Sequence, residues 1–416
     1  MIFNRLKNIL TYLVIISFSI IIFLLGSWFL FKNDVIHFNL TDKLVKEYDY
    51  NSAKNSERRV LILGDSQLEK WPMKHCLYKD LADYFDFQDI GYLNAAHQGF
   101  GPIEYEDQLS KIIPDYKPNL ILLFYYAGND LTDVIYRENN KPKQRNYPVV
   151  FTEEENDSGS KQIDKTQAKI EWELFEEKGI DPIIIQYARN RLANPNKIGP
   201  EYVNPHILAI GAWKPDYHFD NCTRNKVASS YGWYLLLKRF ERIMTMADSI
   251  DAAVGIVVIP SNVQVDTSHY NFYRKTNFKI SDELLFSNAP QQVLYEFAKD
   301  SKIKYLDLLP YFKSADHTGE LYFENDDHLS EKGHLLAFDV LKNKLLTSLL
   351  KDSSGTNNVR KHNVYIKHEK WVVRQQMEII REDSAWMPNI REKALKNNIP
   401  VDSQLFLDAR YIVSKR

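Results

Sequence analysis

The sequence predicts an α/β fold, in which helices pack on an open parallel sheet, and three observations support this prediction. Short apolar runs end at or just before Gly or Pro, which is typical of buried parallel strands that enter a loop. Segments with helical character alternate with these runs along the chain. Of the 416 residues, 44% are hydrophobic and 26% are charged, with 15 Gly and 16 Pro, so the chain is expected to be globular.

The expected strands and helices follow one another from residue 59 to about residue 350. Strands are expected at Arg59–Gly64, Asn119–Tyr126, Ala253–Ile259 and Lys304–Leu308. Helices are expected at Lys70–Phe85, Ile103–Ile113, Tyr231–Ser249 and Lys332–Leu350. We therefore assign residues 59–351 to one α/β domain.

Three other parts of the chain do not fit a minimal α/β domain. Residues 33–58 are polar and are expected to be a linker. Residues from about 135 to 228 are rich in Asn, Lys, Glu and Tyr and predict an insertion over one end of the sheet, of the kind that often forms a lid. Residues 356–416 predict a helical C-terminal extension, because apolar residues from Trp371 to Ala394 recur near helical spacing. We interpret its excess of Lys and Arg as a solvated basic face.

The charge balance and the cysteines exclude several classes of protein. The chain has 53 Lys or Arg and 55 Asp or Glu, and its net charge of −2 argues against a nucleic-acid partner. It has two cysteines, Cys76 and Cys222, and no C-x-x-C pair, which excludes a disulfide-rich scaffold and a zinc ribbon. The sequence leaves open whether these two cysteines pair.

One segment has the opposite character to the mean hydropathy of −0.40, which is that of a soluble protein. Ile9–Phe31 is uncharged and, as about 23 residues of helix, would span roughly 34 Å, enough to cross a bilayer core of about 30 Å. Arg5 and Lys7 precede it, so residues 1–32 predict a cytoplasmic N-terminus and one transmembrane signal anchor, with the domain periplasmic or extracellular. The alternatives are a buried core helix or a cleaved signal, for which Gly26–Phe29 is a poor cleavage site.

Four short blocks carry residues that are suited to catalysis. Gly64–Ser66 follows the first expected strand, at the end of a parallel sheet where α/β folds present reacting groups. Asn94–Pro102 is a glycine-containing loop, and Gly128–Asp130 ends another strand. Asn325–His334 places a His after two carboxylates at the start of the last long helix. Each block alone is also compatible with an ordinary turn or helix cap.

In this order, the blocks supply a nucleophile, a backbone donor, a side-chain amide donor and a base with a carboxylate beside it. Acyl transfer needs this set, because a serine hydroxyl is a weak nucleophile until an oriented base takes its proton. The oxyanion that forms must also meet donors that are already in place. The sequence has no G-x-S-x-G, H-E-x-x-H or phosphate-loop motif, and no cofactor is expected.

The four blocks resemble those of the SGNH (GDSL-type) hydrolase superfamily, which centre on Ser, Gly, Asn and His in this order. The resemblance covers residues 59 to about 350 and implies a flavodoxin-like three-layer α/β/α fold. It implies that Ser66 is the nucleophile and His328 the general base. The amides of Ser66 and Gly99 and the side chain of Asn129 would then donate to the oxyanion.

The fourth block departs from the commonest family pattern, in which an Asp stands three positions before the His. That position is Asn325 here. Asp326 is our choice for the orienting acid, because a branch that resembles the alginate O-acetyltransferases has its Asp there. Asp327 is less favoured, since adjacent side chains rarely face each other, and without either acid a Ser-His dyad would remain. A metal site at Asp326, Asp327 and His328 is not expected, because no second block of ligands accompanies it.

Three other polar residues of these blocks are expected to have supporting roles. Asp65 and Asp130 are expected to brace the turns that they occupy rather than to contact substrate. His97 stands where the family more often has a small residue, and is expected to be structural or to line the substrate site.

Together these features predict a membrane-anchored serine esterase or O-acyltransferase. Its substrate would be an acyl ester, and acetyl is our choice for the acyl group, of an envelope glycan or a lipid-linked molecule near the anchor. The resemblance to O-acetyltransferases adds a multi-pass acyl-donor protein as an expected partner. The alternative is a non-catalytic envelope binding or scaffold protein with the same fold, which Asn325 and the basic extension favour.

Overall fold

The computed structural model describes most of the chain between residues 56 and 352 and part of the chain on the C-terminal side of residue 352. The described residues are 49–50, 56–139, 153–155, 161–163, 172–194, 197, 199–224, 227–352, 373, 376–377, 380–381, 385–397 and 399–415. The chain divides into two compact units, Met1–Tyr50, which contains the short strand β1 (Asp49–Tyr50), and Asn51–Arg416. The second unit contains the predicted α/β domain.

The expected membrane-spanning segment Ile9–Phe31 lies outside the described residues, as does most of the linker at 33–58. Among the helices that the structure describes, none is both long and apolar enough to cross a membrane. Membrane attachment therefore stays a prediction from the sequence.

Five parallel strands form the central sheet of the second unit, which confirms the predicted α/β class. Across the sheet they lie in the order β3 (Gly91–Asn94), β2 (Arg59–Leu63), β4 (Leu120–Tyr126), β7 (Ala253–Ile259) and β8 (Lys304–Asp307). This is the 2-1-3-4-5 order of flavodoxin-like sheets, in which the chain switches direction beside the first strand. Every residue of β4 is buried, which explains why this strand is a continuous apolar run rather than an alternating one.

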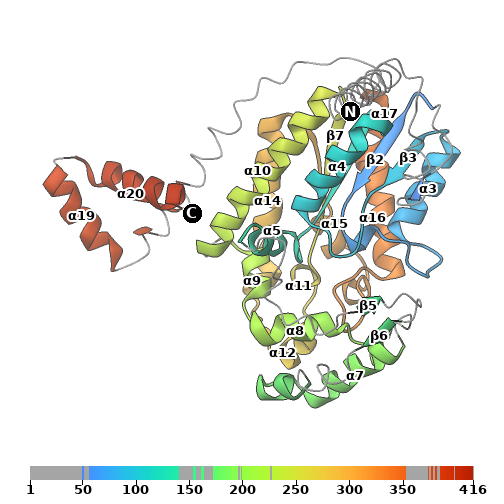
Figure 1. Cartoon of the computed structure of the whole chain (residues 1–416), viewed down its shortest axis with the longest axis horizontal. Helices are drawn as coiled ribbons and strands as arrows, with labels where there is room; N and C mark the ends of the chain where they lie inside the picture. The colour runs from blue at the N-terminus through green and yellow to red at the C-terminus, as the bar shows by residue number, and fades with distance from the viewer. Residues whose placement is uncertain are drawn as a thin grey trace, which may run out of the picture. The chain divides into compact units, whose positions relative to one another are not determined.

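Helices cover both faces of the sheet, so the domain has three layers (Figure 1). One face packs with α3 (Leu77–Phe87), α16 (Glu331–Leu341), a π-helical turn η3 (Lys342–Leu346) and α17 (Thr347–Asp352). The other face carries α4 (Pro102–Tyr116), α5 (Asp130–Asn139), α10 (Val227–Ser249) and α14 (Ala289–Ser301). There Tyr125 of β4 packs against Trp233 and Phe240 of α10.

In this domain the sequence analysis missed one strand and misplaced the start of one helix. The strand β3 was not expected, because its four residues are too short a run to give a pattern. The first helix was expected from Lys70 but begins at Leu77. Pro72 accounts for part of the difference, since Trp71, which precedes it, is disfavoured in the helical region. Short helical turns complete the domain at η1 (Ser66–Leu68), α15 (Leu309–Lys313) and η2 (Thr318–Glu320).

The described part of the expected insertion forms a second apolar cluster with the chain that follows β7. The described part of the insertion contains the hairpin of β5 (Glu153–Glu155) and β6 (Lys161–Ile163), then α7 (Pro182–Ala193), α8 (Pro205–Trp213) and α9 (Tyr217–Cys222). Its partners after β7 are α11 (Asn262–Val265), α12 (Tyr270–Lys275) and α13 (Glu283–Phe286). Figure 1 shows α7, α8 and α12 beyond the end of the sheet at which β7 leads into α11.

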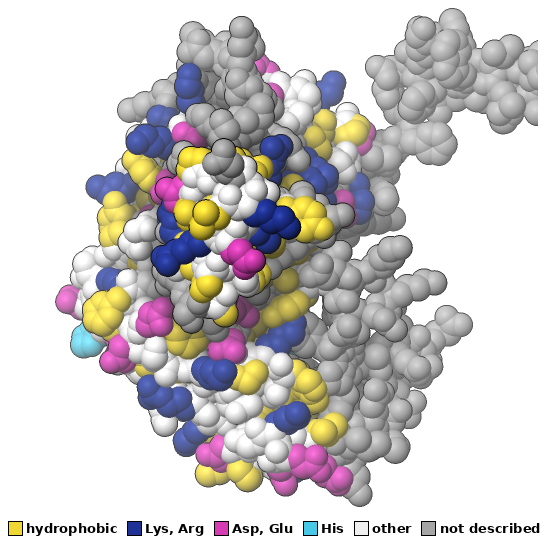
Figure 2. Space-filling model, turned by 90° about the vertical axis from the view of Figure 1, so that its left-hand side faces the viewer, with side chains coloured by type: hydrophobic (Ala, Val, Ile, Leu, Met, Phe, Trp, Pro, Cys, Tyr) yellow, Lys and Arg dark blue, Asp and Glu magenta, His cyan; other side chains and the backbone are white. Residues whose placement is uncertain are grey.

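The described part of the expected C-terminal extension includes the helices α19 (Trp386–Asn397) and α20 (Val401–Lys415). They share a small apolar cluster that includes Ile390, Leu405 and Ala409. On the molecular face drawn in Figure 2, Lys and Arg side chains are interspersed with acidic and apolar ones, as expected for a chain with a net charge of −2.

The two cysteines are free and buried, which answers the question that the sequence left open. Cys76 precedes the first residue of α3, and Cys222 ends α9, where its Sγ lies 3.6 Å from the carbonyl oxygen of Ala127. They act as small apolar residues in two different parts of the domain rather than as a disulfide.

Candidate active site

Ser66 lies at the carboxyl end of β2, in the first position of the turn η1. The carboxylate of Asp65 caps this turn by accepting a hydrogen bond of 3.0 Å from the backbone N–H of Gln67. The apolar strand therefore delivers the serine to the end of the sheet, and the cap holds the turn in place.

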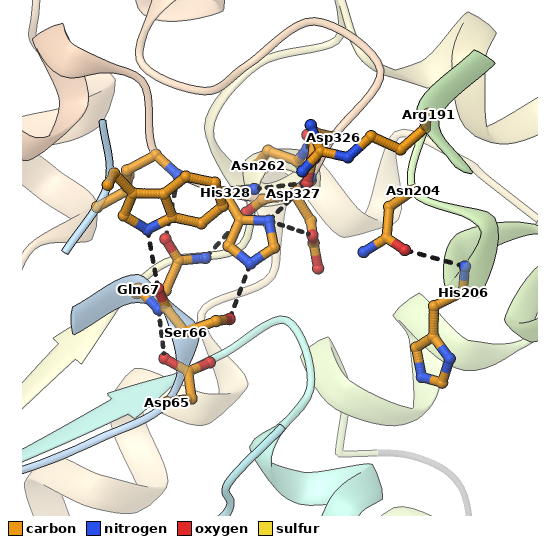
Figure 3. A network of polar contacts seen from close by, with 12 residues as sticks. Asp65, Ser66, Gln67, Arg191, Asn204, His206, Asn262, Asp326, Asp327 and His328 are labelled. Atoms are coloured by element: carbon orange, nitrogen blue, oxygen red, sulfur yellow. Dashed lines mark hydrogen bonds and ion pairs between the residues drawn. The ribbon is translucent and has the colours of Figure 1, made fainter. Parts of the chain in front are cut away.

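Ser66, His328 and Asp326 form a continuous chain of polar contacts (Figure 3). Oγ of Ser66 lies 2.8 Å from Nε2 of His328, and Nδ1 of the same ring lies 2.6 Å from Oδ1 of Asp326. Ser66 and His328 are each 8% exposed. The structure thus brings together three residues that are separated by up to 262 positions in the chain.

The two neighbouring residues of the fourth block contact the site in different ways. Oδ1 of Asp327 lies 3.3 Å from Nδ1 of His328, farther than that of Asp326. Asn325 has a φ of +63° and donates a hydrogen bond of 2.6 Å from its side chain to the carbonyl oxygen of Pro200. An ionised Asp could not donate this bond, which gives a physical reason for Asn at this position.

Charge and burial act against each other in this group. Burial lowers the pKa of His328, but the charges of Asp326 and Asp327 outweigh it and raise this pKa to about 9. Burial raises the pKa of Asp326, yet the charge and hydrogen bonds of His328 bring it down to about 2. For Asp327 burial prevails over the charge of His328, and the pKa rises to about 7. The arrangement favours an imidazolium that is paired with the carboxylate of Asp326.

The three expected oxyanion donors lie at the ends of adjacent strands. Ser66 follows β2, Gly99 lies in the loop after β3, and Asn129 lies directly after β4. Gly99 has a φ of +71°, a conformation that glycine adopts at no cost, and its carbonyl accepts a hydrogen bond from Arg137 of α5. Among the described residues no hydrogen bond joins Gly99 or Asn129 to Ser66. Their role as donors stays a prediction.

The carboxylates that were expected to brace turns make contacts of that kind. Asp130 accepts hydrogen bonds of 3.0 Å from the hydroxyl of Tyr105 and of 2.9 Å from the backbone N–H of Tyr126. Burial raises the pKa of Asp130 well above its ordinary value and raises that of Asp65 to about 6. His97 is mostly exposed, and its Nδ1 lies 3.4 Å from Oε1 of Glu69.

Four residues at the site were missed from the sequence. Trp71 donates a hydrogen bond of 3.0 Å from its indole to the carbonyl of Ser66, and its ring centroid lies 4.8 Å from that of His328. The other three, Gln67, Tyr126 and Asn262, contact the backbone of the loop that carries His328. For Gln67, Tyr126 and Asn262 the available signal was their position, since each lies within four residues of the carboxyl end of a strand.

The insertion also reaches the site. Figure 3 shows Arg191, Asn204 and His206, from α7 and the start of α8, across from Asp326 and Asp327. Asn204 caps α8 by accepting a hydrogen bond of 3.0 Å from the backbone N–H of His206. The side chains of Arg191 and Asn204 extend toward the carboxylate side of the site, whereas the ring of His206 points away from it.

Asp326, Asp327 and His328 also form a group that could hold a metal ion, with ligand atoms within 4.8 Å of one another. Both ring nitrogens of His328 already lie within hydrogen-bond distance of a partner, Nδ1 of Asp326 and Nε2 of Ser66. The donor set therefore fits a hydrogen-bonded acid and base, and we derive no step through a metal.

No protein-family model matches the chain, and no curated protein matches it. Similar solved structures include a GDSL-like lipase from Bacteroides thetaiotaomicron, which is 10% identical, with 76% of this chain and 97% of that chain covered and a TM-score of 0.34. A lipase/acylhydrolase from Enterococcus faecalis is 13% identical, with coverages of 69% and 96% and a TM-score of 0.33. A psychrotrophic esterase from Pseudoalteromonas is 11% identical, with coverages of 71% and 100% and a TM-score of 0.33. These likenesses extend to the fold at most, and we base the proposed function on the geometry of the site.

Proposed function

We propose that the protein is a serine esterase or O-acyltransferase of the SGNH type. The observation that carries this proposal is the continuous chain from Oγ of Ser66 through His328 to Asp326 at the carboxyl end of a parallel sheet. In this proposal Ser66 is the nucleophile, His328 the general base and Asp326 the acid that orients it.

The proposed reaction has two halves. The hydroxyl oxygen of Ser66 attacks the carbonyl carbon of an ester while its proton passes to Nε2 of His328. The amides of Ser66 and Gly99 and the side chain of Asn129 would stabilise the oxyanion. The proton then passes from His328 to the leaving alkoxide, which departs and leaves an ester on Ser66. Water or a sugar hydroxyl attacks that ester in the second half, and Ser66 regains its proton through His328.

The proposed substrate is an acyl ester, most simply an acetyl ester, of an envelope glycan or a lipid-linked molecule. The apolar segment Ile9–Phe31 supports this choice of substrate, because it would tether the domain to the outer side of the cell membrane. Tethering would raise the effective concentration of the domain near substrates at that membrane. A multi-pass acyl-donor protein belongs to the same proposal if the acceptor is a sugar.

Labelling with a fluorophosphonate probe tests the proposed chemistry. The wild-type protein is expected to be labelled, and Ser66→Ala is expected to lose the label and at least about a thousandfold of the hydrolysis rate of p-nitrophenyl acetate. Ser110→Ala, an exposed serine on α4, is the matched control and should behave as wild type. A wild-type protein that stays unlabelled while a known serine esterase is labelled would instead support a non-catalytic scaffold.

The acetyl content of the surface polysaccharide distinguishes the two acceptors. In a strain that carries Ser66→Ala, a rise in acetyl content supports an esterase, because removal of acetyl groups has stopped. A fall supports a transferase, because their addition has stopped. An unchanged acetyl content would contradict the proposed glycan substrate.

A further inference from the structure

His328 follows two backbone carbonyls that accept three side-chain hydrogen bonds. The side-chain amide of Asn262 donates to the carbonyl of Asp326 at 3.1 Å. The hydroxyl of Tyr126 and the side-chain amide of Gln67 both donate to the carbonyl of Asp327, at 2.7 and 3.1 Å. Figure 3 shows Gln67 and Asn262 close to the loop of Asp326, Asp327 and His328.

The three donors come from three adjacent strands of the sheet. Gln67 follows β2, Tyr126 is the last residue of β4, and Asn262 follows β7. The pairing of these parallel strands places the donors side by side at one end of the sheet. The loop that carries His328 is therefore hydrogen-bonded to residues at or after the ends of three central strands.

Burial makes these contacts specific. Gln67 and Asn262 have no exposed surface, and Tyr126 is 1% exposed. A buried amide or hydroxyl that lacks a hydrogen bond is costly, so each side chain is restricted to positions at which its partner is present. Polar contacts of this kind favour one position of the loop, whereas apolar packing alone would tolerate several.

Gln67 contacts the loop on both sides of His328. Besides its bond to the carbonyl of Asp327, its Oε1 accepts a hydrogen bond of 3.0 Å from the backbone N–H of Leu329. Gln67 is also bonded covalently to Ser66. One side chain thus links the nucleophile to the base across the 262 positions that separate them in the chain.

We propose that Gln67, supported by Tyr126 and Asn262, is a positioning residue that holds Nε2 of His328 at the hydroxyl of Ser66. This inference rests on the proposed function. Catalysis by a base requires it to stay within hydrogen-bond reach of the proton that it removes, and a displacement of about 1 Å can cost on the order of a hundredfold in rate. In this proposal Gln67 acts through His328, by its hydrogen bonds to Asp327 and Leu329.

The test compares variants that keep the shape of the site. Gln67→Met retains most of the volume and removes both hydrogen bonds; we expect kcat to fall about 10- to 100-fold with KM within about threefold. Gln67→Glu retains the acceptor for Leu329 and is expected to recover part of this loss. Tyr126→Phe removes a single hydroxyl and is expected to lower kcat about 3- to 10-fold.

The control is Gln291→Met, a buried glutamine of α14 whose side chain bonds that of Gln264. It loses similar hydrogen bonds away from the loop and should keep the wild-type kcat. Wild-type kcat in folded Gln67→Met, or in Tyr126→Phe if Gln67→Met does not fold, would overturn the positioning role. Failure of the proposed function is a different result, because the wild-type protein itself would then show no labelling or turnover.

Discussion

Asp326 and Asp327 are neighbours in the chain, and both place a carboxylate near Nδ1 of His328. The distances of 2.6 and 3.3 Å make Asp326 the hydrogen-bond partner and Asp327 a second nearby charge. Their pKa values separate accordingly, because the contact with His328 brings that of Asp326 to about 2 whereas burial brings that of Asp327 to about 7. Two adjacent acids of the same type thus differ in pKa because their carboxylates lie at different distances from His328.

This difference predicts the pH dependence of the reaction. A base must be neutral, and the two carboxylates raise the pKa of His328 to about 9 against the effect of burial, so kcat/KM should rise with pH into the alkaline range. Asp326→Asn removes a negative charge that favours the imidazolium, so the pKa of His328 should fall. The rise of kcat/KM with pH should therefore occur at lower pH in this variant. The same variant should lower the maximal kcat by about 10²- to 10⁴-fold, because the ring loses its orienting partner.

Asp327→Asn is the matched control for this prediction. It removes the more distant charge, so we expect a smaller shift of the limb in the same direction and a loss of kcat of no more than about tenfold. Equal losses in the two variants, measured as kcat/KM between pH 6 and 10, would show that Asp326 has no special role.

At the scale of elements, the start of α16 packs closely against the backbone at Leu321, which follows η2. Ser330 caps this helix by accepting a hydrogen bond of 3.3 Å from the N–H of Gly333, and its own N–H donates to the carbonyl of Leu321 at 3.0 Å. A Cβ at Gly333 would overlap that same carbonyl oxygen of Leu321. Glycine is therefore required here by the close approach of two backbone segments.

Gly333→Ala is expected to lower the free energy of unfolding by about 1–3 kcal/mol, because the backbone around Leu321 must shift to admit the methyl group. Urea denaturation followed by circular dichroism measures this change. Asp339→Ala, at an exposed position of the same helix, is the control and should change stability by no more than about 0.5 kcal/mol. A Gly333→Ala protein as stable as the control would show that the contact relaxes freely.

At the scale of the whole molecule, the described part of the domain contains two large apolar clusters that share one connecting segment. The cluster at the sheet includes Phe85 and Val265, and the cluster of the insertion includes Phe175 and Val263. Val263 and Val265 both belong to α11, which follows β7 directly. We infer that the two clusters unfold together, since melting either one removes support from α11.

Phe175→Ala and Phe85→Ala test this inference, because both side chains are fully buried, one in each cluster. Each is expected to cost about 3–5 kcal/mol and to lower the midpoint of a single thermal transition in differential scanning calorimetry. Phe87→Ala, at an exposed position, should leave that midpoint nearly unchanged. A separate transition that moves only in Phe175→Ala would mean that the insertion unfolds independently.

Much of the fold was predictable because its signals are local. The runs that became β2, β4 and β7 are apolar along their buried residues, and each ends near Gly or Pro. The strand β3 was not predictable in this way, since its four residues acquire strand structure only by pairing with β2. The start of α3 was misplaced because the effect of Pro72 was overlooked.

By itself, the sequence determined the α/β class, the order of the four blocks and the placement of Ser66 at a strand end. These features depend on local conformational preferences, which apolar runs and the Gly and Pro residues at their ends reveal. The family resemblance favoured Asp326 over Asp327 as the partner of His328, and the tertiary structure gives the two distances. The tertiary structure alone decided that Gln67, Tyr126 and Asn262 hydrogen-bond the loop of that histidine. The contacts of Gln67 with this loop, at Asp327 and Leu329, join residues up to 262 positions apart. Which polar groups meet across such separations depends on how strands align, and that alignment is a property of the packed sheet.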